Sequence, residues 1–256
     1  MYTNVLRLIV FAFVLVCLSG CGNPPPETNS PADESVTEPA PPVVEPVTID
    51  ATVLHEWRMD GEVVAFSNRV ANTGLNSIAL ASASYSLSAW IRPTAFLEPI
   101  PDLLKVTGGL QTIIGNGAQA NNGYYHEGLA GFWMALNGKR LVYLMSDNES
   151  ANVSKGRAIT KGATDIAPDE WTHIAVVVDR ADHSVKLFVN GVLESGAGDC
   201  SIIKTQTSQV PLIIGARTAN GDCPFLGDIT SVQLFSQALT LQQVQVLAAP
   251  TSLPDG

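Results

Sequence analysis

The 256-residue chain is poor in basic residues, cysteine and aromatic side chains. It has 14 Lys and Arg against 24 Asp and Glu, a formal net charge of −10, four Cys, and only 7% aromatic residues. It contains no Lys/Arg run. Surfaces that bind nucleic acid concentrate positive charge, so we expect no nucleic-acid partner.

The common short catalytic signatures are also missing. No Gly-x-Ser-x-Gly elbow is present, and "HEGLA" (126–130) lacks the second His of a zinc helix. "GNGAQA" (115–120) resembles a phosphate-binding turn, but "NNGYYHEG" follows it where a helix would be required. We therefore expect a protein that is not an enzyme.

The N-terminus carries a targeting segment. Residues 5–20 are an almost unbroken apolar run with one cation, Arg7, which is too short and wrongly flanked for a membrane-spanning helix. The run ends in "LSGC" (18–21), which resembles a bacterial lipobox. This resemblance implies a lipoprotein signal peptide over 1–20 and lipidation of Cys21. Gly22 in place of Asp implies the outer membrane of the bacterial cell envelope. The alternative is an ordinary secretory signal.

A second segment is too polar to fold. Residues 22–50 contain eight Pro and six acidic residues, and none that is basic or aromatic. Such a composition cannot bury enough apolar surface to offset the entropy of ordering. We expect 21–50 to be a lipid-anchored, disordered tether rich in Pro and Glu.

One domain is expected over 51–249, with a frayed tail at 250–256. Residues 51–256 hold 13 basic and 18 acidic residues, a formal charge of −5, and two cysteines, Cys200 and Cys223. In an oxidising compartment such a pair favours a disulfide. The alternative is a metal site, but two thiolates without a nearby His make a poor one.

The hydrophobic period of this domain is two, which predicts strands. Asn137-Gly138 and Asn190-Gly191 predict type I′ hairpins, with Leu136 opposite Lys139 in the first. Both faces of that first hairpin are largely apolar, which indicates central strands covered on each side. Thr240 is expected to cap a short helix over "LQQVQVLAA". The expected strands cover 52–59, 76–82, 85–93, 111–117, 131–138, 139–147, 171–179, 184–191, 211–217 and 227–235. The fold class is all-β, a two-sheet antiparallel sandwich with a short C-terminal helix.

The stretch "WTHIAVVVDRADHSVKLFVNG" (171–191) contains two histidines among β-branched residues. Thr172, Ile174, Val176 and Val178 share one strand face. His173 and His183 lie on different strands, and no feature of the sequence brings them to one ion. We interpret His173 as structural and the stretch as a wall of the fold.

Several of these segments follow one another in the order and spacing of a known family. "SLSAWIRP", "DEWTHIAVVVD", "VKLFVNGVLE", "PLIIGAR" and "FLGDITSVQLFSQALTLQQV" resemble the laminin G-like, concanavalin A-like jelly-roll domains. The resemblance covers about residues 51–249. It implies two curved antiparallel sheets and often a carbohydrate or protein ligand, but it does not fix an activity.

Family members that bind calcium or cleave glycans carry acids that this chain largely lacks. Asp60 resembles the first calcium acid, but "FSNRVANTG" and "GDITSV" lack the others. Calcium at Asp60 is therefore an alternative to a simple turn residue before Gly61, and no other cofactor is expected. Hydrolases of this fold place two carboxylates on one strand face. No Glu here has an Asp two residues later. A hydrolase or lyase stays an alternative only if acids converge from different strands.

A candidate ligand site lies in "NGAQANNGYYHEG" (116–128) and the strand after it. Amides beside aromatic rings suit a polyol surface. The predicted contacts are Asn121, Asn122, Tyr124, Tyr125 and Trp133. The function expected is a lipid-anchored envelope module that binds a glycan or envelope polymer without catalysis. The alternative is a structural or protein–protein module, with another envelope protein as partner.

Overall fold

The computed structural model describes the folded part of the chain in ten stretches. These are residues 51–57, 71–73, 78–81, 83–103, 109–116, 131–147, 157–204, 206–208, 211–218 and 220–249. The chain divides into two units, Met1–Val44 and Glu45–Gly256, and every described residue belongs to the second. The predictions for the signal peptide 1–20, for Cys21 and the whole tether 21–50, and for the tail 250–256 lie outside the described residues.

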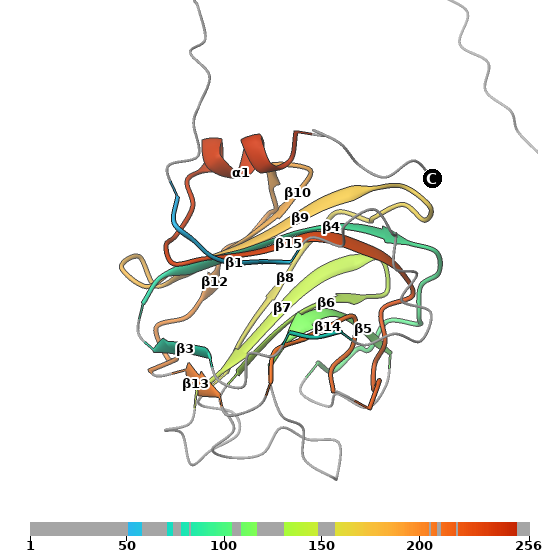
Figure 1. The fold of residues 1–256 in the computed structure, drawn as a ribbon, viewed down its shortest axis with the longest axis horizontal. Helices are drawn as coiled ribbons and strands as arrows, with labels where there is room; N and C mark the ends of the chain where they lie inside the picture. The colour runs from blue at the N-terminus through green and yellow to red at the C-terminus, as the bar shows by residue number, and fades with distance from the viewer. Residues whose placement is uncertain are drawn as a thin grey trace, which may run out of the picture. The chain divides into compact units, whose positions relative to one another are not determined.

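The larger sheet has seven strands in the order β1-β15-β4-β9-β10-β11, with β12 also paired to β10 (Figure 1). All its pairings are antiparallel, as the sequence predicted. In β4 the side chains alternate between the two faces of the sheet, so that Tyr85, Leu87, Ala89 and Ile91 all face the main core. The strands are β1 (Val53–Trp57), β4 (Tyr85–Pro93), β9 (Thr172–Asp179), β10 (Ser184–Val189), β11 (Val192–Leu193), β12 (Gly198–Asp199) and β15 (Gly227–Phe235).

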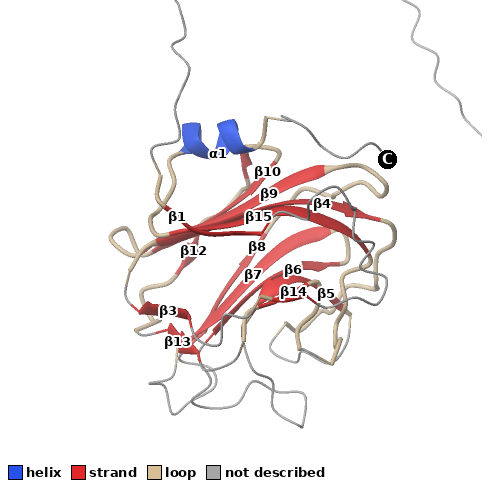
Figure 2. Ribbon diagram, viewed as in Figure 1, coloured by secondary structure: helices blue, strands red, loops and turns tan. Residues whose placement is uncertain are grey.

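The second sheet has six strands in the order β2-β14-β5-β6-β7-β8. It is also antiparallel. A separate two-stranded sheet pairs β13 with β3. The strands are β2 (Ala71–Asn72), β3 (Ile78–Ala81), β5 (Leu110–Gly115), β6 (Gly131–Asn137), β7 (Arg140–Ser146), β8 (Arg157–Lys161), β13 (Gln206–Ser208) and β14 (Ile213–Ile214). The strands of the two main sheets form separate layers in Figure 2, which confirms the jelly-roll sandwich.

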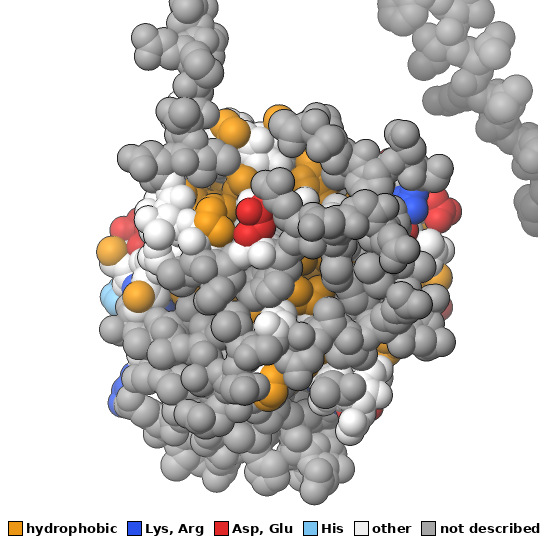
Figure 3. All heavy atoms as spheres, viewed as in Figure 1, with side chains coloured by type: hydrophobic (Ala, Val, Ile, Leu, Met, Phe, Trp, Pro, Cys, Tyr) orange, Lys and Arg blue, Asp and Glu red, His pale blue; other side chains and the backbone are white. Residues whose placement is uncertain are grey.

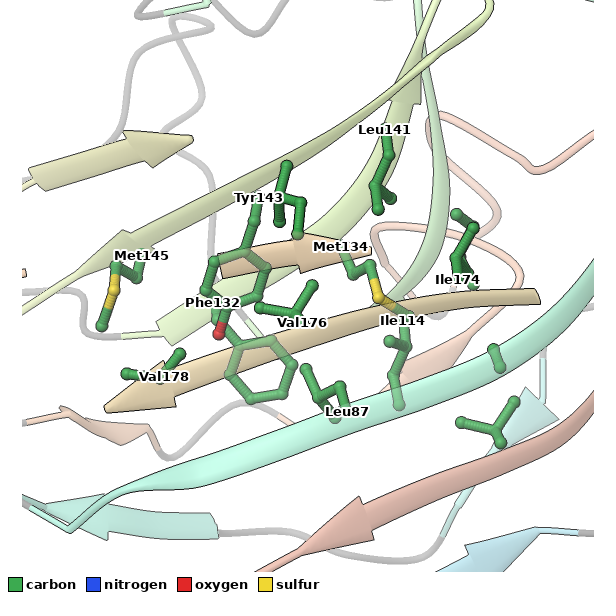
Figure 4. Close-up of a cluster of buried hydrophobic side chains, with 14 of the residues drawn as sticks. Leu87, Ile114, Phe132, Met134, Leu141, Tyr143, Met145, Ile174, Val176 and Val178 are labelled. Atoms are coloured by element: carbon green, nitrogen blue, oxygen red, sulfur yellow. The ribbon is translucent and has the colours of Figure 1, made fainter. Parts of the chain in front are cut away.

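The main core fills the space between the two sheets. Phe132, Met134 and Tyr143 from the six-stranded sheet meet Leu87 and Val176 from the seven-stranded sheet (Figure 4). Tyr85 and Tyr143 join their hydroxyl oxygens at 2.6 Å inside this core, so a hydrogen bond links one layer to the other. Burial raises the pKa of the Tyr143 hydroxyl well above its ordinary value, and the bond is therefore between neutral phenols.

The β6–β7 hairpin corrects a predicted register. Asn137 pairs with Arg140, and Leu136 with Leu141 where Lys139 was expected. The central residues of the turn are thus Gly138 and Lys139, and of the two only Gly138 has a positive φ, 59°. Glycine at the first central position suits a type II′ turn rather than type I′. The observed pairing of β6 with β7 differs from the predicted pairing by two residues, so each side chain stays on its predicted face of the sheet.

The second Asn-Gly hairpin matches its prediction. Asn190 and Gly191 have φ values of 49° and 74°, the two positive values of a type I′ turn. Val189 pairs with Val192 across it. Gly191 also lies against helix α1, because a Cβ there would stand 3.2 Å from Cβ of Ala248.

The helix α1 (Leu241–Leu247) covers the outer face of the seven-stranded sheet (Figures 1 and 2). Thr240 is its N-cap as predicted, and Gln243 closes a capping box with it. Val244 is fully buried among apolar residues of that face, including Val177 and Phe188. Figure 3 shows hydrophobic side chains at the surface around α1 and β1, where Leu241 is 49% and Val53 40% exposed.

The predicted disulfide is not formed. Cys200 and Cys223 both keep their thiols and are buried in different parts of the sandwich. Cys200 Sγ lies 3.8 Å from the carbonyl oxygens of Asp179 and Ser184, at the β9–β10 end of the larger sheet. Cys223 is held beside β5, where its carbonyl accepts a hydrogen bond from Thr112 N. The disulfide was predicted from the number of cysteines and from the expected oxidising compartment. Neither gives the distance between the two residues, which decides whether a disulfide can form.

No helix in the described part of the chain is long and apolar enough to cross a bilayer.

Candidate binding cleft

Most of the predicted contact residues lie outside the described residues, namely Asn121, Asn122, Tyr124 and Tyr125. Trp133, on β6, is described and is only 1% exposed. It packs with Leu103, Leu110 and Leu144 on the outer face of the six-stranded sheet. An indole buried in this way cannot present its ring to a ligand, so the structure does not support Trp133 as an exposed contact.

The predicted metal residue, Asp60, also lies outside the described residues. Among the residues that are described, no group of three or more His, Cys, Asp or Glu could hold a metal ion. His173 is fully buried on β9, with Nε2 2.8 Å from Oγ of Ser88 and the ring edge-on to Trp90. It is a structural histidine, as the sequence indicated.

A cleft opens instead between the chain that leaves β4, the β6–β7 turn and the loop that follows β8. The chain over 94–103 is fastened by two amide side chains. Gln111 Nε2 donates to Ala95 O at 2.9 Å. Asn137 Oδ1 accepts from Ile100 N at 2.7 Å and Asn137 Nδ2 donates to Ile100 O at 3.0 Å, so one side chain satisfies both backbone polar groups of Ile100.

The fastened chain forms one wall of the cleft. Ile100 and Leu103 pack on the apolar outer face of the six-stranded sheet, and Pro99 lies against Gly138. A Cβ added to Gly138 would stand 3.2 Å from Pro99 Cβ, so the turn and the wall are in contact. The cleft has a volume of about 800 Å³, and its lining is Phe96–Pro99, Asn137–Arg140, Val142, Lys161, Gly162 and Asp165.

The opposite wall is the loop that follows β8. Gly162 N donates to Leu141 O at 2.7 Å, and Ile166 N donates to Lys139 O at 2.9 Å. Oε2 of Glu194 accepts hydrogen bonds from the backbone N–H groups of Ala163 and Thr164. This wall is thus joined both to the hairpin and to the chain after β11.

Glu194 is 6% exposed, yet it stays ionised. Burial raises the pKa of its carboxyl, but the hydrogen bonds from Thr164 and Ala163 outweigh burial and bring the pKa below its ordinary value. A buried carboxylate with two backbone donors holds a loop rigidly, because each bond is charge-assisted.

Five charged side chains line the cleft, and they differ in how far they are paired. Arg140 Nε lies 2.7 Å from Asp165 Oδ1, with both side chains more than half exposed. The hydrogen bond from Arg140 lowers the pKa of the Asp165 carboxyl. Lys139 Nζ stands 5.8 Å from the centre of the Phe96 ring. In the described part of the chain, Lys161 and Glu98 have no ion pair or side-chain hydrogen bond.

The sequence did not reveal this site for two reasons. β8, "RAITK", was not expected, since its alternation is short and its outward side chains, Arg157 and Lys161, are charged. The 94–103 segment has no periodic pattern at all. One signal was available: the apolar outer faces of β6 and β7 require a cover, and this cover forms one wall of the cleft.

The arrangement is suited to binding. An aromatic side chain, three cations and two carboxylates line the cleft, and such a set can contact hydroxyl-rich or charged small molecules. Asp165 is held ionised by Arg140, whereas a general acid needs a raised pKa.

Comparison with known proteins identifies similar sequences and folds. A laminin G-type profile, described as concanavalin A-like lectin/glucanases superfamily, matches residues 67–245. No curated protein sequence matches the chain.

Several solved structures are similar at low identity. The binding domain of botulinum neurotoxin serotype G is 14% identical, with a TM-score of 0.46, over 70% of this chain and 38% of that one. The CBM40 of Ruminococcus gnavus IT-sialidase is 13% identical, with a TM-score of 0.47, over 66% and 85%. Domain 4 of a GH43 extracellular arabinanase from Geobacillus stearothermophilus, in complex with arabinotriose, is 22% identical, with a TM-score of 0.41, over 66% and 67%. These likenesses are too distant to transfer a ligand or its contacts.

Proposed function

Because the chain belongs to the concanavalin A-like lectin/glucanases superfamily, we propose that it is a carbohydrate-binding module whose ligand occupies the cleft beside the β6–β7 turn. The observation that carries the proposal is the cleft itself. It is about 800 Å³ in volume, within the range of small-molecule sites.

The walls of the cleft support this proposal because they are set before a ligand arrives. Asn137 holds Ile100 on one side, and Glu194 holds Ala163 and Thr164 on the other. A preorganised site loses little entropy on binding. The groups exposed inside it can then accept and donate hydrogen bonds to sugar hydroxyls, while Phe96 offers an apolar surface.

We propose that the module binds without cleaving. Glycoside hydrolysis needs one carboxylic acid that stays protonated and a second carboxylate about 5–9 Å away. Of the two acids in the cleft, Asp165 has a lowered pKa and a guanidinium partner. An acid held in this state is a poor proton donor at neutral pH.

We further propose that the module is displayed from the bacterial envelope on the tether 21–50, with Cys21 as the lipidated residue. The support is the sequence alone: the apolar run, the "LSGC" ending and the Pro-rich acidic stretch. Metabolic labelling with a palmitate analogue should mark the wild-type protein and not Cys21→Ser. A Cys21→Ser protein that is still labelled and still sediments with membranes would contradict the anchor.

A glycan array with the purified protein tests the binding proposal. For the glycans that bind, Phe96→Ala should weaken affinity about tenfold, since loss of an aromatic contact removes on the order of 1.4 kcal/mol. Leu241→Ala is the matched control, because it removes an exposed apolar side chain from α1, which packs on the seven-stranded sheet. Near-UV circular dichroism of each variant verifies the fold.

Each result decides between alternatives. Equal affinity of the wild type and Phe96→Ala for a glycan would show that the glycan binds outside the cleft. The predicted loop contacts are then the next test, with Tyr124→Ala and Tyr125→Ala. No binding to any glycan would overturn the carbohydrate proposal and favour a structural or protein–protein module.

A further inference from the structure

Building on the proposed function, we infer that the glycan bound in this cleft is anionic, with Lys161 as the contact for its carboxylate or sulfate groups. The first observation is how charge is distributed. Residues 51–256 carry 13 basic and 18 acidic side chains. The cleft has the opposite sign, since Lys139, Arg140 and Lys161 face it against Glu98 and Asp165.

The second observation is the position of Lys161. It ends β8 and pairs with Val142 on β7, and both residues line the cleft. Arg140 lies two residues before Val142 and therefore on the same face of the sheet. Lys161 and Arg140 are therefore diagonal neighbours across the β7–β8 pair, where long side chains are within reach of each other.

The third observation is that the positive charges of the cleft are only partly neutralised by acids. Asp165 is bonded to Arg140, and its carboxyl also feels the charge of Lys139. Lys139 has the Phe96 ring beneath it. Lys161 is exposed and, within the described residues, has no acid partner. An anionic group that enters beside Lys161 gains attraction from this unpaired cation and from the neighbouring Arg140.

Glu98 limits how much negative charge the ligand can carry. It stands on the opposite wall, exposed and without an ion pair in the described part of the chain. The five side chains sum to a single positive charge at neutral pH. A ligand with one anionic group at the Lys161 side and hydroxyls at the Glu98 side matches this asymmetry, because a carboxylate accepts hydrogen bonds from hydroxyls.

A matched pair of polymers tests the inference with the purified protein. Polygalacturonate and its fully methyl-esterified form share one backbone and differ in charge, and dextran sulfate against dextran supplies the sulfate arm. We expect the charged member of at least one pair to bind more tightly. Lys161→Gln should weaken that binding about fivefold and leave the neutral polymer unaffected, as for a partly exposed ion pair.

Lys186→Gln is the control, since this substitution removes the same charge from β10, which belongs to the other sheet. Equal weakening by both variants would show general attraction to a polyanion and overturn the inference. Equal affinity for the charged and neutral members of both pairs would overturn it too, and would leave carbohydrate binding intact. If a glycan array and all four polymers show no binding, the proposed function fails, and this inference fails with it.

Discussion

Replacing His173 with glutamine is expected to reduce the loss in the free energy of unfolding that the protein shows as the pH falls below 6.5. The imidazole is fully buried on β9, with Nε2 2.8 Å from Ser88 Oγ, and Nδ1 has no hydrogen-bond partner among the described residues. Burial lowers its pKa from 6.5 to about 4. The folded protein thus keeps His173 neutral at a pH where an unfolded chain would protonate it.

The sign and size of the effect follow from proton linkage. Between pH 6.5 and 4 the unfolded chain binds more protons at His173 than the folded chain, so stability falls as the pH falls. Above pH 6.5 this residue makes no difference. At pH 5 it costs about 2 kcal/mol, and the loss approaches about 3 kcal/mol near pH 4.

Urea unfolding followed by tryptophan fluorescence at pH 7.5 and pH 5.0 measures this loss. Other groups titrate in the same range, so the comparison is between proteins. His173→Gln should lose about 2 kcal/mol less stability than wild type over this interval. His183→Asn is the control, because His183 is exposed and its positive φ of 52° suits asparagine. The reasoning is refuted if His173→Gln and wild type lose the same stability.

Three further changes test the contacts that hold the sandwich and its cleft. Tyr85→Phe and Tyr143→Phe should each cost about 1–2 kcal/mol in urea unfolding, and the double variant less than their sum; additive costs would exclude coupling through the 2.6 Å bond. Asn137→Ala should raise amide exchange at Ile100 while β9 stays protected, and unchanged exchange would contradict its role as a fastener. Glu194→Gln should cost about 1–2 kcal/mol at pH 7, and because the folded pKa is lowered this cost should shrink as the pH falls below that pKa; a cost independent of pH would show that charge is irrelevant.

The sandwich could be predicted because each of its central strands carries its own pattern. β9 alternates so that Ile174, Val176 and Val178 face the main core, while Ala175 and Val177 face α1. The helix was predictable for a similar reason, since Thr240 and Gln243 form a capping box within four residues. In these cases the signal and the structure it specifies lie in the same stretch of chain.

The errors arose where structure depends on distant contacts. Trp133 was predicted as a ligand contact, although the apolar residues on both faces of β6 already indicated a cover. The cover includes Ile100 and Leu103, from a segment without periodicity. The β6–β7 turn was misread because Asn-Gly suits type I′ locally. The observed register leaves Asn137 within β6, where its amide binds Ile100.

Different residues determine the shape of the cleft and the charges inside it. Its walls are held by Asn137 and Glu194, whose polar groups bind the protein's own backbone. Two charged side chains of the cleft, Lys161 and Glu98, are exposed. Neither makes an ion pair or a side-chain hydrogen bond within the described part of the chain. Substitution of an exposed side chain without partners changes stability by about 0.5 kcal/mol or less. Ligand preference can therefore change at Lys161 and Glu98 with the fold unchanged, whereas a change at Asn137 or Glu194 alters the walls themselves.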